Sequence, residues 1–394
     1  MLSAIRSLIR STRTVFLREI TLLSRRPFFL MLLTVFPAGL FLLFALIYSR
    51  SVVTEIPMAV LDADHSALSL TLIRSMDATR SIALVRTVDR TEEIEELMKY
   101  GTVQGAIVIP KDFERNIKKG KQTTVTVYKN SFNLIIGNSL LKDASTVVKT
   151  ISAGVLLKKF RSAGMMEDQA MALANPIRLD TSNLYDPYYN YETYFVPCLI
   201  MAMFQMLVMV TAVVPYGGEK ESGSHRELHS NTDLSPAAVL FGKSLPYLLL
   251  HMVTTLFILV GLFTFFGIPI HGSGNLLFLY VMIGNGAVFF LGFLASIALH
   301  GQIFATEVMV FLGTPAMLFS GYTFPVEAMP ASLVAMAHVI PFTTFFSGFV
   351  KIYQEGAPLA VISSELMTLT ALLIVTAVAS WWMIRRQMRA RGAQ

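Results

Sequence analysis

Residues 28–48 read FFLMLLTVFPAGLFLLFALIY, a continuous run of 21 residues without a charged side chain. At about 1.5 Å of rise per residue, a helix of this length crosses the ~30 Å hydrocarbon core of a bilayer. The run is too long for the apolar region of a signal peptide, and no small-x-small cleavage site follows it. Residues 28–49 therefore predict an uncleaved transmembrane helix that anchors the chain.

The first 27 residues are basic and amphipathic. Apolar side chains recur at close to helical spacing from Leu2 to Leu23, and Glu19 is the one acidic residue in this stretch. The pattern is typical of a helix that lies in the lipid headgroup plane on the cytoplasmic side. A helix packed on a soluble partner is the alternative. Residues 1–27 thus predict a connecting helix, with the arginines Arg6, Arg10, Arg13, Arg18, Arg25 and Arg26.

The composition of the chain favours a membrane protein with one soluble part. Hydrophobic residues make up 54% of the chain and charged residues 15%, whereas soluble domains average about 45–50% and 25%. Residues 50–190 hold 34 of the 58 formal charges, so this stretch is predicted to be soluble. The net charge of +6 does not indicate nucleic acid binding, because the excess lies at the termini beside apolar spans. The single cysteine, Cys198, excludes an intrachain disulfide and a CxxC metal site.

Residues 50–190 alternate between strand and helix patterns, which predicts an α/β domain with a largely parallel sheet. The stretch contains no Gly-rich phosphate loop, HExxH motif or nucleophile elbow, so we predict no enzymatic activity. The predicted strands are 56–61, 82–88, 103–109 and 123–128, and the predicted helices are 66–79, 92–100, 111–118 and 133–163.

Five further apolar spans follow in residues 191–384, and a basic tail, 385–394, ends the chain. Six spans place both termini on one side of the membrane, and both termini are basic, so the positive-inside rule predicts that both are cytoplasmic. The prediction is an integral membrane α-helical bundle of six transmembrane helices with an inserted extracytoplasmic α/β domain, residues 50–190. The later spans are predicted near 194–215, 242–266, 276–299, 303–319 and 360–384.

The stretch 216–242, YGGEKESGSHRELHSNTDLSPAAVLFG, is cytoplasmic on this topology and dense in charge. A short charged helix there is a suitable contact for a cytoplasmic partner; a solvated loop is the alternative. Gly242, Lys243 and Ser244 match the end of a Walker A motif, but Ala237 stands where that motif requires glycine. The triplet also opens a span instead of following a strand. We therefore exclude nucleotide binding by this chain.

Residues 319–346 read FSGYTFPVEAMPASLVAMAHVIPFTTFF, an apolar stretch interrupted by three prolines. Pro325, Pro330 and Pro341 cannot lie within one unkinked helix. Broken backbone at membrane depth persists only where protein or a water-filled cavity satisfies its polar groups. The segment 320–345 therefore predicts short re-entrant helices on the outer side, with an ordinary extracellular loop as the alternative.

Ionisable residues are scarce in and beside the predicted spans; they include His251, His300 and Glu307. Ion-coupled carriers place acidic or histidine relays within the helix bundle, so this scarcity disfavours an ion-coupled carrier. The second span is rich in methionine, which indicates lipid contact or helix packing in preference to a promiscuous binding surface.

Together these features resemble the type-2 ABC exporter permeases, in the subgroup with a large outer domain after the first span. The resemblance covers the whole chain. It includes the family patterns Glu-x-Glu-x-Gly-Thr…Leu…Pro…Gly-Lys and Ser-Gly-x-x-Phe-Pro…Met-Pro…Ile-Pro. In this sequence Ser224 stands where threonine is usual, Thr232 lies near the usual proline, and Pro236 is displaced. The matching residues are Glu219, Glu221, Gly223, Leu228, Gly242 and Lys243, and then Ser320, Gly321, Phe324, Pro325, Met329, Pro330, Ile340 and Pro341.

The resemblance implies roles for three groups of residues. Coupling to an ATPase is implied for Glu219, Glu221, Gly223, Arg226, Glu227, Leu228 and Lys243. A re-entrant gate is implied for Gly321, Phe324, Pro325, Pro330 and Pro341. Spans two and five are implied to line the pathway, with Phe204, Gln205, Met209, Phe304 and Met309 as its residues.

The sequence therefore predicts a permease in a bacterial inner membrane that moves an amphiphilic small molecule, drug or lipid-like compound outward. A separate cytoplasmic ABC ATPase would bind ATP and Mg²⁺ and hydrolyse the ATP, so this chain is not an enzyme and holds no metal. The resemblance implies a second permease copy or paralogue; a periplasmic adaptor and membrane lipid are further candidate partners. A membrane-anchored receptor or adaptor-docking protein, acting through its outer domain, is the alternative. Co-purification with an ATPase would separate these functions.

Overall fold

A computed structural model of the chain describes residues 2–48, 53–131, 134–174, 191–224 and 235–392. The chain divides into two compact units. The helical unit comprises Met1–Ser49 and Leu184–Gln394, and the α/β unit comprises Arg50–Asn183. The side of the membrane on which the α/β unit lies stays a prediction.

The α/β unit is built on a four-stranded sheet of order β2-β1-β3-β4. The central strand β1 is parallel to β2 and to β3, and β4 is antiparallel to β3. A side chain at Gly105 would meet the carbonyl oxygen of Tyr128 at 2.8 Å, so this position of β3 needs glycine. The strands are β1 (Ile56–Asp62), β2 (Ile82–Thr87), β3 (Gly105–Ile109) and β4 (Thr126–Lys129).

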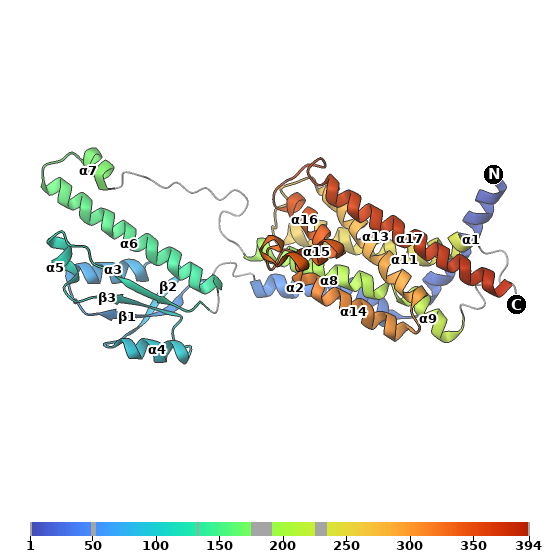
Figure 1. Cartoon of the computed structure of the whole chain (residues 1–394), viewed down its shortest axis with the longest axis horizontal. Helices are drawn as coiled ribbons and strands as arrows, with labels where there is room; N and C mark the ends of the chain where they lie inside the picture. The colour runs from blue at the N-terminus through green and yellow to red at the C-terminus, as the bar shows by residue number, and fades with distance from the viewer. Residues whose placement is uncertain (1, 49–52, 132–133, 175–190, 225–234, 393–394) are drawn as a thin grey trace. The chain divides into compact units, whose positions relative to one another are not determined.

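Helices cover both faces of this sheet, as the apolar and buried sequence of β1 requires. Alternate side chains of a strand point to opposite faces. Met58 accordingly packs with helices α3, α5 and α6, whereas Ala59 packs on the α4 side (Figure 1). The helices are α3 (Ala67–Asp77), α4 (Thr91–Lys99), α5 (Phe113–Lys118), α6 (Leu134–Ser162) and α7 (Glu167–Ala174).

The helical unit confirms the predicted membrane bundle. Five of its described helices are long and apolar enough to span a bilayer, or six if one bent pair counts as a span. The five are Pro27–Tyr48, Phe195–Ser222, Pro236–Phe265, Gly274–Ala298 and Ser363–Arg389. In element terms these are α2 (Pro27–Tyr48), α8 (Tyr191–Thr211) with α9 (Val214–Ser222), α11 (Pro236–Leu256) with the π-helical η1 (Phe257–Leu262) and α12 (Phe263–Phe265), α13 (Gly274–Ala298) and α17 (Ser363–Gly392).

The predicted fifth span, residues 303–319, lies within one residue of the observed helix at both ends. It forms α14 (Gln302–Leu318), whose 17 residues rise about 25 Å, less than the ~30 Å of a hydrocarbon core. The candidate for a sixth span is instead the pair α15 (Ala331–Val339) and α16 (Pro341–Tyr353), which bends by 82°. The described residues therefore agree with a bundle of about six spans, although the bent pair and not α14 is the candidate for the sixth.

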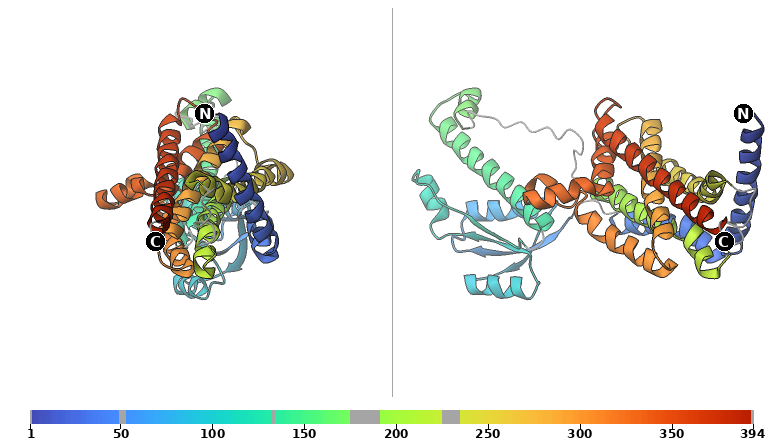
Figure 2. Two further views of the ribbon diagram at one scale, coloured as in Figure 1. Left: turned by 90° about the vertical axis from the view of Figure 1, so that its right-hand side faces the viewer. Right: turned by 45° about the vertical axis from the view of Figure 1, so that its right-hand side comes forward.

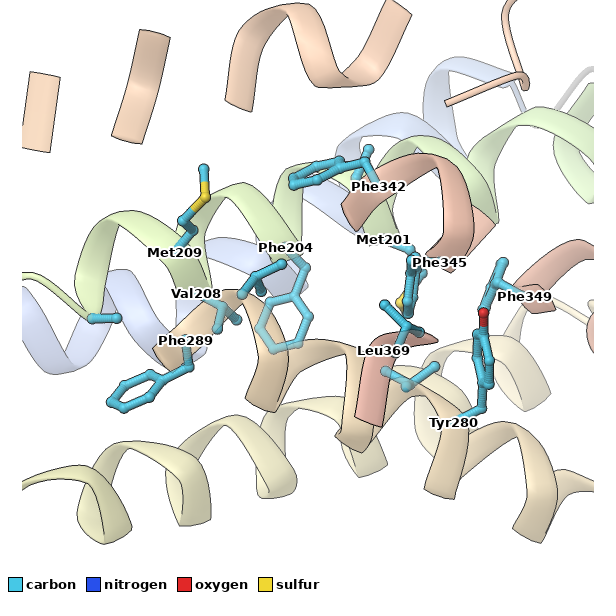
Figure 3. Packing of buried hydrophobic residues seen from close by; sticks show 14 of the residues in the cluster. Met201, Phe204, Val208, Met209, Tyr280, Phe289, Phe342, Phe345, Phe349 and Leu369 are labelled. Atoms are coloured by element: carbon cyan, nitrogen blue, oxygen red, sulfur yellow. The ribbon is translucent and has the colours of Figure 1, made fainter. Parts of the chain in front are cut away.

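Helix α8 lies at the centre of the helical unit. Of its span, 78% is buried within the chain, whereas only 22% of α2 and of α17 is buried, as expected for lipid-facing helices. Figure 3 shows Met201, Phe204 and Val208 of α8 among aromatic side chains of neighbouring helices. Helix α13 approaches α8 closely at Gly292, where a side chain would overlap the carbonyl oxygen of Met209.

Replacing Gly292 with alanine should separate α13 from α8 and lower the thermal unfolding midpoint of the purified protein. Overpacking of this kind costs roughly 1–3 kcal/mol. Gly39 on α2 is the matched control, because a side chain there meets no atom within 4 Å. Gly39→Ala should stabilise its helix by roughly 0.5–1 kcal/mol. Equal midpoints for the two variants would contradict the close α8–α13 contact.

Candidate functional site

Helix α1 (Leu2–Ser24) docks on the start of α11 through a narrow stripe. Val15, Glu19 and Leu23, spaced four apart, are buried, so they occupy one face of the helix. Gly242 on α11 permits the approach, because a side chain there would meet Val15 at 2.5 Å. Other apolar side chains of α1, such as Ile9, remain exposed. Figure 2 shows α1 lying across the end of the helical unit, a position that suits a connecting helix in the headgroup plane.

A buried ammonium group holds α1, α9 and α11 together. Lys243 Nζ on α11 lies 3.1 Å from Glu19 Oε2 of α1 and 2.9 Å from Glu219 Oε2 of α9. It also donates a hydrogen bond of 2.7 Å to the carbonyl oxygen of Pro215. Tyr247 donates to Glu19 at 2.9 Å, and Arg18 pairs with Glu219. We call Arg18, Glu19, Glu219, Lys243 and Tyr247 the polar network.

The polar network balances its charges. Two carboxylates face one ammonium and one guanidinium, so the cluster carries no net charge. The side chain of Lys243 is fully buried and those of Glu19 and Glu219 nearly so. Removing one partner of a buried ion pair strands a charge and costs much more than breaking an exposed pair. The three helices therefore hold one another in a fixed relation.

The last turn of α9 clamps the turn between α13 and α14. Lys220 donates hydrogen bonds of 3.2 Å and 2.7 Å to the carbonyl oxygens of Ile297 and Leu299 at the end of α13. Glu221 accepts a hydrogen bond of 2.7 Å from the backbone N–H of Gln302, at the start of α14. A cation at a helix C-terminus and an anion at a helix N-terminus both complement the helix dipole. We call Lys220 and Glu221 the α9 clamp.

The boundaries of this region explain two of the sequence signals. Gly223 ends α9 in the left-handed conformation, with φ 75°, which favours glycine. Ser235 caps α11 by accepting from the N–H of Ala238 at 3.1 Å, and Pro236 occupies the first helical turn, where its missing N–H costs nothing. Three residues with an implied coupling role, Arg226, Glu227 and Leu228, lie outside the described residues.

The proline-rich segment breaks the chain into short helices, as its sequence predicts. Pro330 precedes α15 and Pro341 opens α16, so both prolines lie at helix starts. Gly321 adopts φ 78°, and Pro325 precedes the short 3₁₀ turn η2 (Val326–Ala328). Thr343 connects the two ends of the segment, because its hydroxyl donates a hydrogen bond of 2.8 Å to the carbonyl oxygen of Phe319. Phe324 is exposed. A re-entrant position in the membrane stays a prediction.

The residues with an implied pathway role do not share one surface. Phe204, Gln205, Met209 and Met309 are buried within the protomer, whereas Phe304 is 52% exposed. Their role as pathway lining stays a prediction. Among the described residues, no cluster of three or more His, Cys, Asp or Glu side chains could hold a metal ion.

Sequence reasoning missed the partners of the implied coupling residues. Glu19, Tyr247 and Lys220 complete the polar network and the α9 clamp, but no motif marks them. For Glu19 a signal did exist, since it is the one acidic residue in a basic segment and lies on the apolar stripe with Val15 and Leu23.

Apolar spans, a basic amphipathic helix and the α9 clamp at one end of the bundle are features of a multi-pass membrane protein. Residues 27–382 match the model of the ABC-2 family transporter proteins. The chain belongs to this family, and it is a transmembrane permease subunit of an ABC exporter in an inner membrane. A membrane-anchored receptor is not favoured.

Three similar proteins cover most of the chain. The probable multidrug ABC transporter permease YbhS of Escherichia coli (strain K12) is 22% identical over 96% of this chain and 98% of its own length. The probable multidrug ABC transporter permease YbhR of the same strain is 23% identical over 85% of this chain and 88% of its own. The inner membrane transport permease YhhJ of Shigella flexneri is 23% identical, over 83% and 85%.

Replacing Lys243 with methionine should destabilise the helical unit by roughly 3–5 kcal/mol, because Glu19 would lose its one cationic partner in the network. The thermal unfolding midpoint of the purified protein measures this loss. Adding Glu19→Gln to the Lys243→Met variant should recover part of it by removing the stranded charge. As a control, Arg90→Ala breaks the exposed pair with Glu93 and should change the midpoint little. A Lys243→Met variant as stable as the wild type would contradict the network.

Proposed function

We propose that this chain is one of two permease copies, identical or paralogous, that move an amphiphilic small molecule, drug or lipid-like compound outward. Two of the relatives are named as probable multidrug permeases, which supports this substrate class. A separate cytoplasmic ATPase would bind ATP and Mg²⁺ and supply the energy. The observation that carries the proposal is the polar network with the α9 clamp, since together they connect α1, α9, α11, α13 and α14.

The proposed topology places both termini in the cytoplasm and the α/β unit outside. The arginines of α1 and of the tail support it through the positive-inside rule. In Figure 1, α1, α9 and the C-terminal end of α17 lie at the same end of the helical unit. This end would then face the ATPase.

Coupling would pass from the ATPase into the spans through α9 and α1. A push on α9 changes the position of Glu219, and the ion pair with Lys243 carries this displacement to α11. The same push acts through Lys220 and Glu221 on the ends of α13 and α14. ATP-driven closure would then bias the permease between two states by differential binding.

Two further partners belong to the proposal. Membrane lipid would cover the exposed apolar faces of α2 and α17, where side chains such as Val35 and Val375 are more than half exposed. A periplasmic adaptor would contact the α/β unit on its outer side.

Affinity purification of the full chain in mild detergent tests the proposal. We expect an ABC ATPase to co-purify, together with a second permease copy. Recovery of the chain without any ATPase would overturn the proposed function.

Replacing Glu221 with alanine should uncouple the permease from its ATPase while leaving membrane insertion intact. The change removes the acceptor at the start of α14 but leaves the polar network in place. Substrate-stimulated ATP hydrolysis by the purified complex should fall roughly fivefold or more. Glu221→Gln keeps an acceptor oxygen and should retain most of the stimulation. Unchanged stimulation in Glu221→Ala would remove the coupling role of the α9 clamp.

A further inference from the structure

Three polar residues in the middle of the helical unit have unpaired polar atoms. Gln205 lies on α8, His251 on α11 and Asn285 on α13, and all three are fully buried. Within the described residues, both amide atoms of Gln205, both ring nitrogens of His251 and the amide oxygen of Asn285 lack a hydrogen-bond partner. We call these three residues the polar junction.

Contacts between neighbouring elements bring the three residues to one place. The ring of His251 lies 5.8 Å from that of Phe204 on α8 and 6.2 Å from that of Phe289 on α13, between centroids. One turn further along α11, Thr255 accepts a hydrogen bond of 3.2 Å from Asn285.

The amide of Gln205 lies against α13, the helix that carries Asn285. A side chain built at Gly284 of α13 would lie 3.0 Å from its amide nitrogen. The polar junction therefore lies where α8, α11 and α13 meet, and Figure 3 shows Phe204 and Phe289 near this meeting point.

The polar junction is exceptional within its own bundle. Within the described residues, five buried side-chain polar atoms without a hydrogen bond belong to it. Glu219 Oε2, by contrast, pairs with the ammonium of Lys243 at 2.9 Å. Ser296, also buried on α13, donates to the carbonyl oxygen of Phe293. Buried polar groups need hydrogen-bond partners, and the described residues supply none to these atoms, so a polar group that entered the junction would be stabilised there.

We propose that the polar junction binds the uncharged hydrogen-bonding group, an amide or a hydroxyl, of an exported amphiphile. The inference rests on the proposed export function. Gln205 and a neutral histidine offer both donors and acceptors, whereas Asn285 offers an acceptor. The three side chains include no fixed charge, so a charged headgroup would find no counter-charge among them. The rings of Phe204 and Phe289 supply apolar walls for the rest of the molecule.

Access to the polar junction requires movement of α11, and this helix is irregular on both sides of His251. Pro246 interrupts its hydrogen bonding before His251, and the π-helical η1 begins at Phe257. Prolines and π-helical turns are points at which helices bend, and π-helical turns frequently occur at functional sites. The segment between them can shift without unfolding the rest of α11.

The test uses the purified full-length permease in lipid nanodiscs, with the thermal unfolding midpoint as the readout. The probes are N-dodecylacetamide, which has an uncharged amide, and dodecylammonium, which has the same chain and a charge. N-dodecylacetamide should raise the midpoint of the wild type, since a ligand that binds the folded state stabilises it. Dodecylammonium should need at least about tenfold more probe for the same rise, the loss expected where a charged group finds no partner.

Gln205→Met and Asn285→Leu each remove hydrogen-bonding atoms and keep a similar volume. Each variant should weaken the response to N-dodecylacetamide roughly threefold to tenfold. Without probe, each should be as stable as the wild type or more stable, because unpaired polar atoms are lost. Ser296→Ala, which removes a paired hydroxyl on the same helix, should respond like the wild type.

Several results would overturn the proposal. They are no response of the wild type to N-dodecylacetamide, equal responses in wild type and variants, an equal response to dodecylammonium, or failure of both variants to fold. The last would mean that the fold itself needs these polar atoms. Binding is measured on the permease alone, so this test does not depend on the ATPase. If the permease shows the expected responses but no ATPase co-purifies with it, the proposed function is wrong and the binding site still stands.

Discussion

The relative positions of α1, α9 and α11 depend on one buried ammonium group. Lys243 has no access to water, so its charge is tolerable only with two carboxylates beside it. One carboxylate comes from α1, which the α/β unit separates from Lys243 in sequence. The other comes from α9, which a charged loop separates from Lys243. The ion pairs consequently make α1, a helix too polar to span the membrane, an integral part of the bundle. Arg18 completes the balance, because two carboxylates around one lysine would leave a net negative charge.

The α9 clamp extends this constraint by a different kind of electrostatics. Lys220 and Glu221 contact the partial charges at the end of α13 and the start of α14. Because both residues lie in one turn of α9, that helix cannot move without changing its contacts with both spans. The polar network and the α9 clamp thus share α9 and give one short helix a connection to most of the bundle.

Local patterns were predictable from the sequence, whereas contacts between distant residues were not. Strand β1 and helix α3 were predicted from their local sequences, and they begin within one residue of the expected positions. The bounds of α14 were likewise predicted to within one residue, 303–319 against Gln302–Leu318. The coupling motif named Glu219 and Lys243, but their pairing with Glu19 depends on how α1 docks, which no local pattern encodes. Likewise, Gln205 was assigned to a pathway by resemblance, and only the structure places its amide beside α13.

The two groups of buried polar residues in the bundle have opposite energetic character, and α11 carries a member of each. Around Lys243 every charge has a partner of opposite charge, which fixes the arrangement of the helices. Within the described residues the ring nitrogens of His251 have no hydrogen-bond partner, so a conformation or ligand that supplies one is favoured. Eight residues separate them, about 12 Å along the helix, with Pro246 between. Under the proposed coupling, a displacement imposed on Lys243 through α1 and α9 would pass to His251 along α11. Pro246 removes one backbone hydrogen bond between the two groups, so α11 can bend there while the ion pairs at Lys243 stay in place.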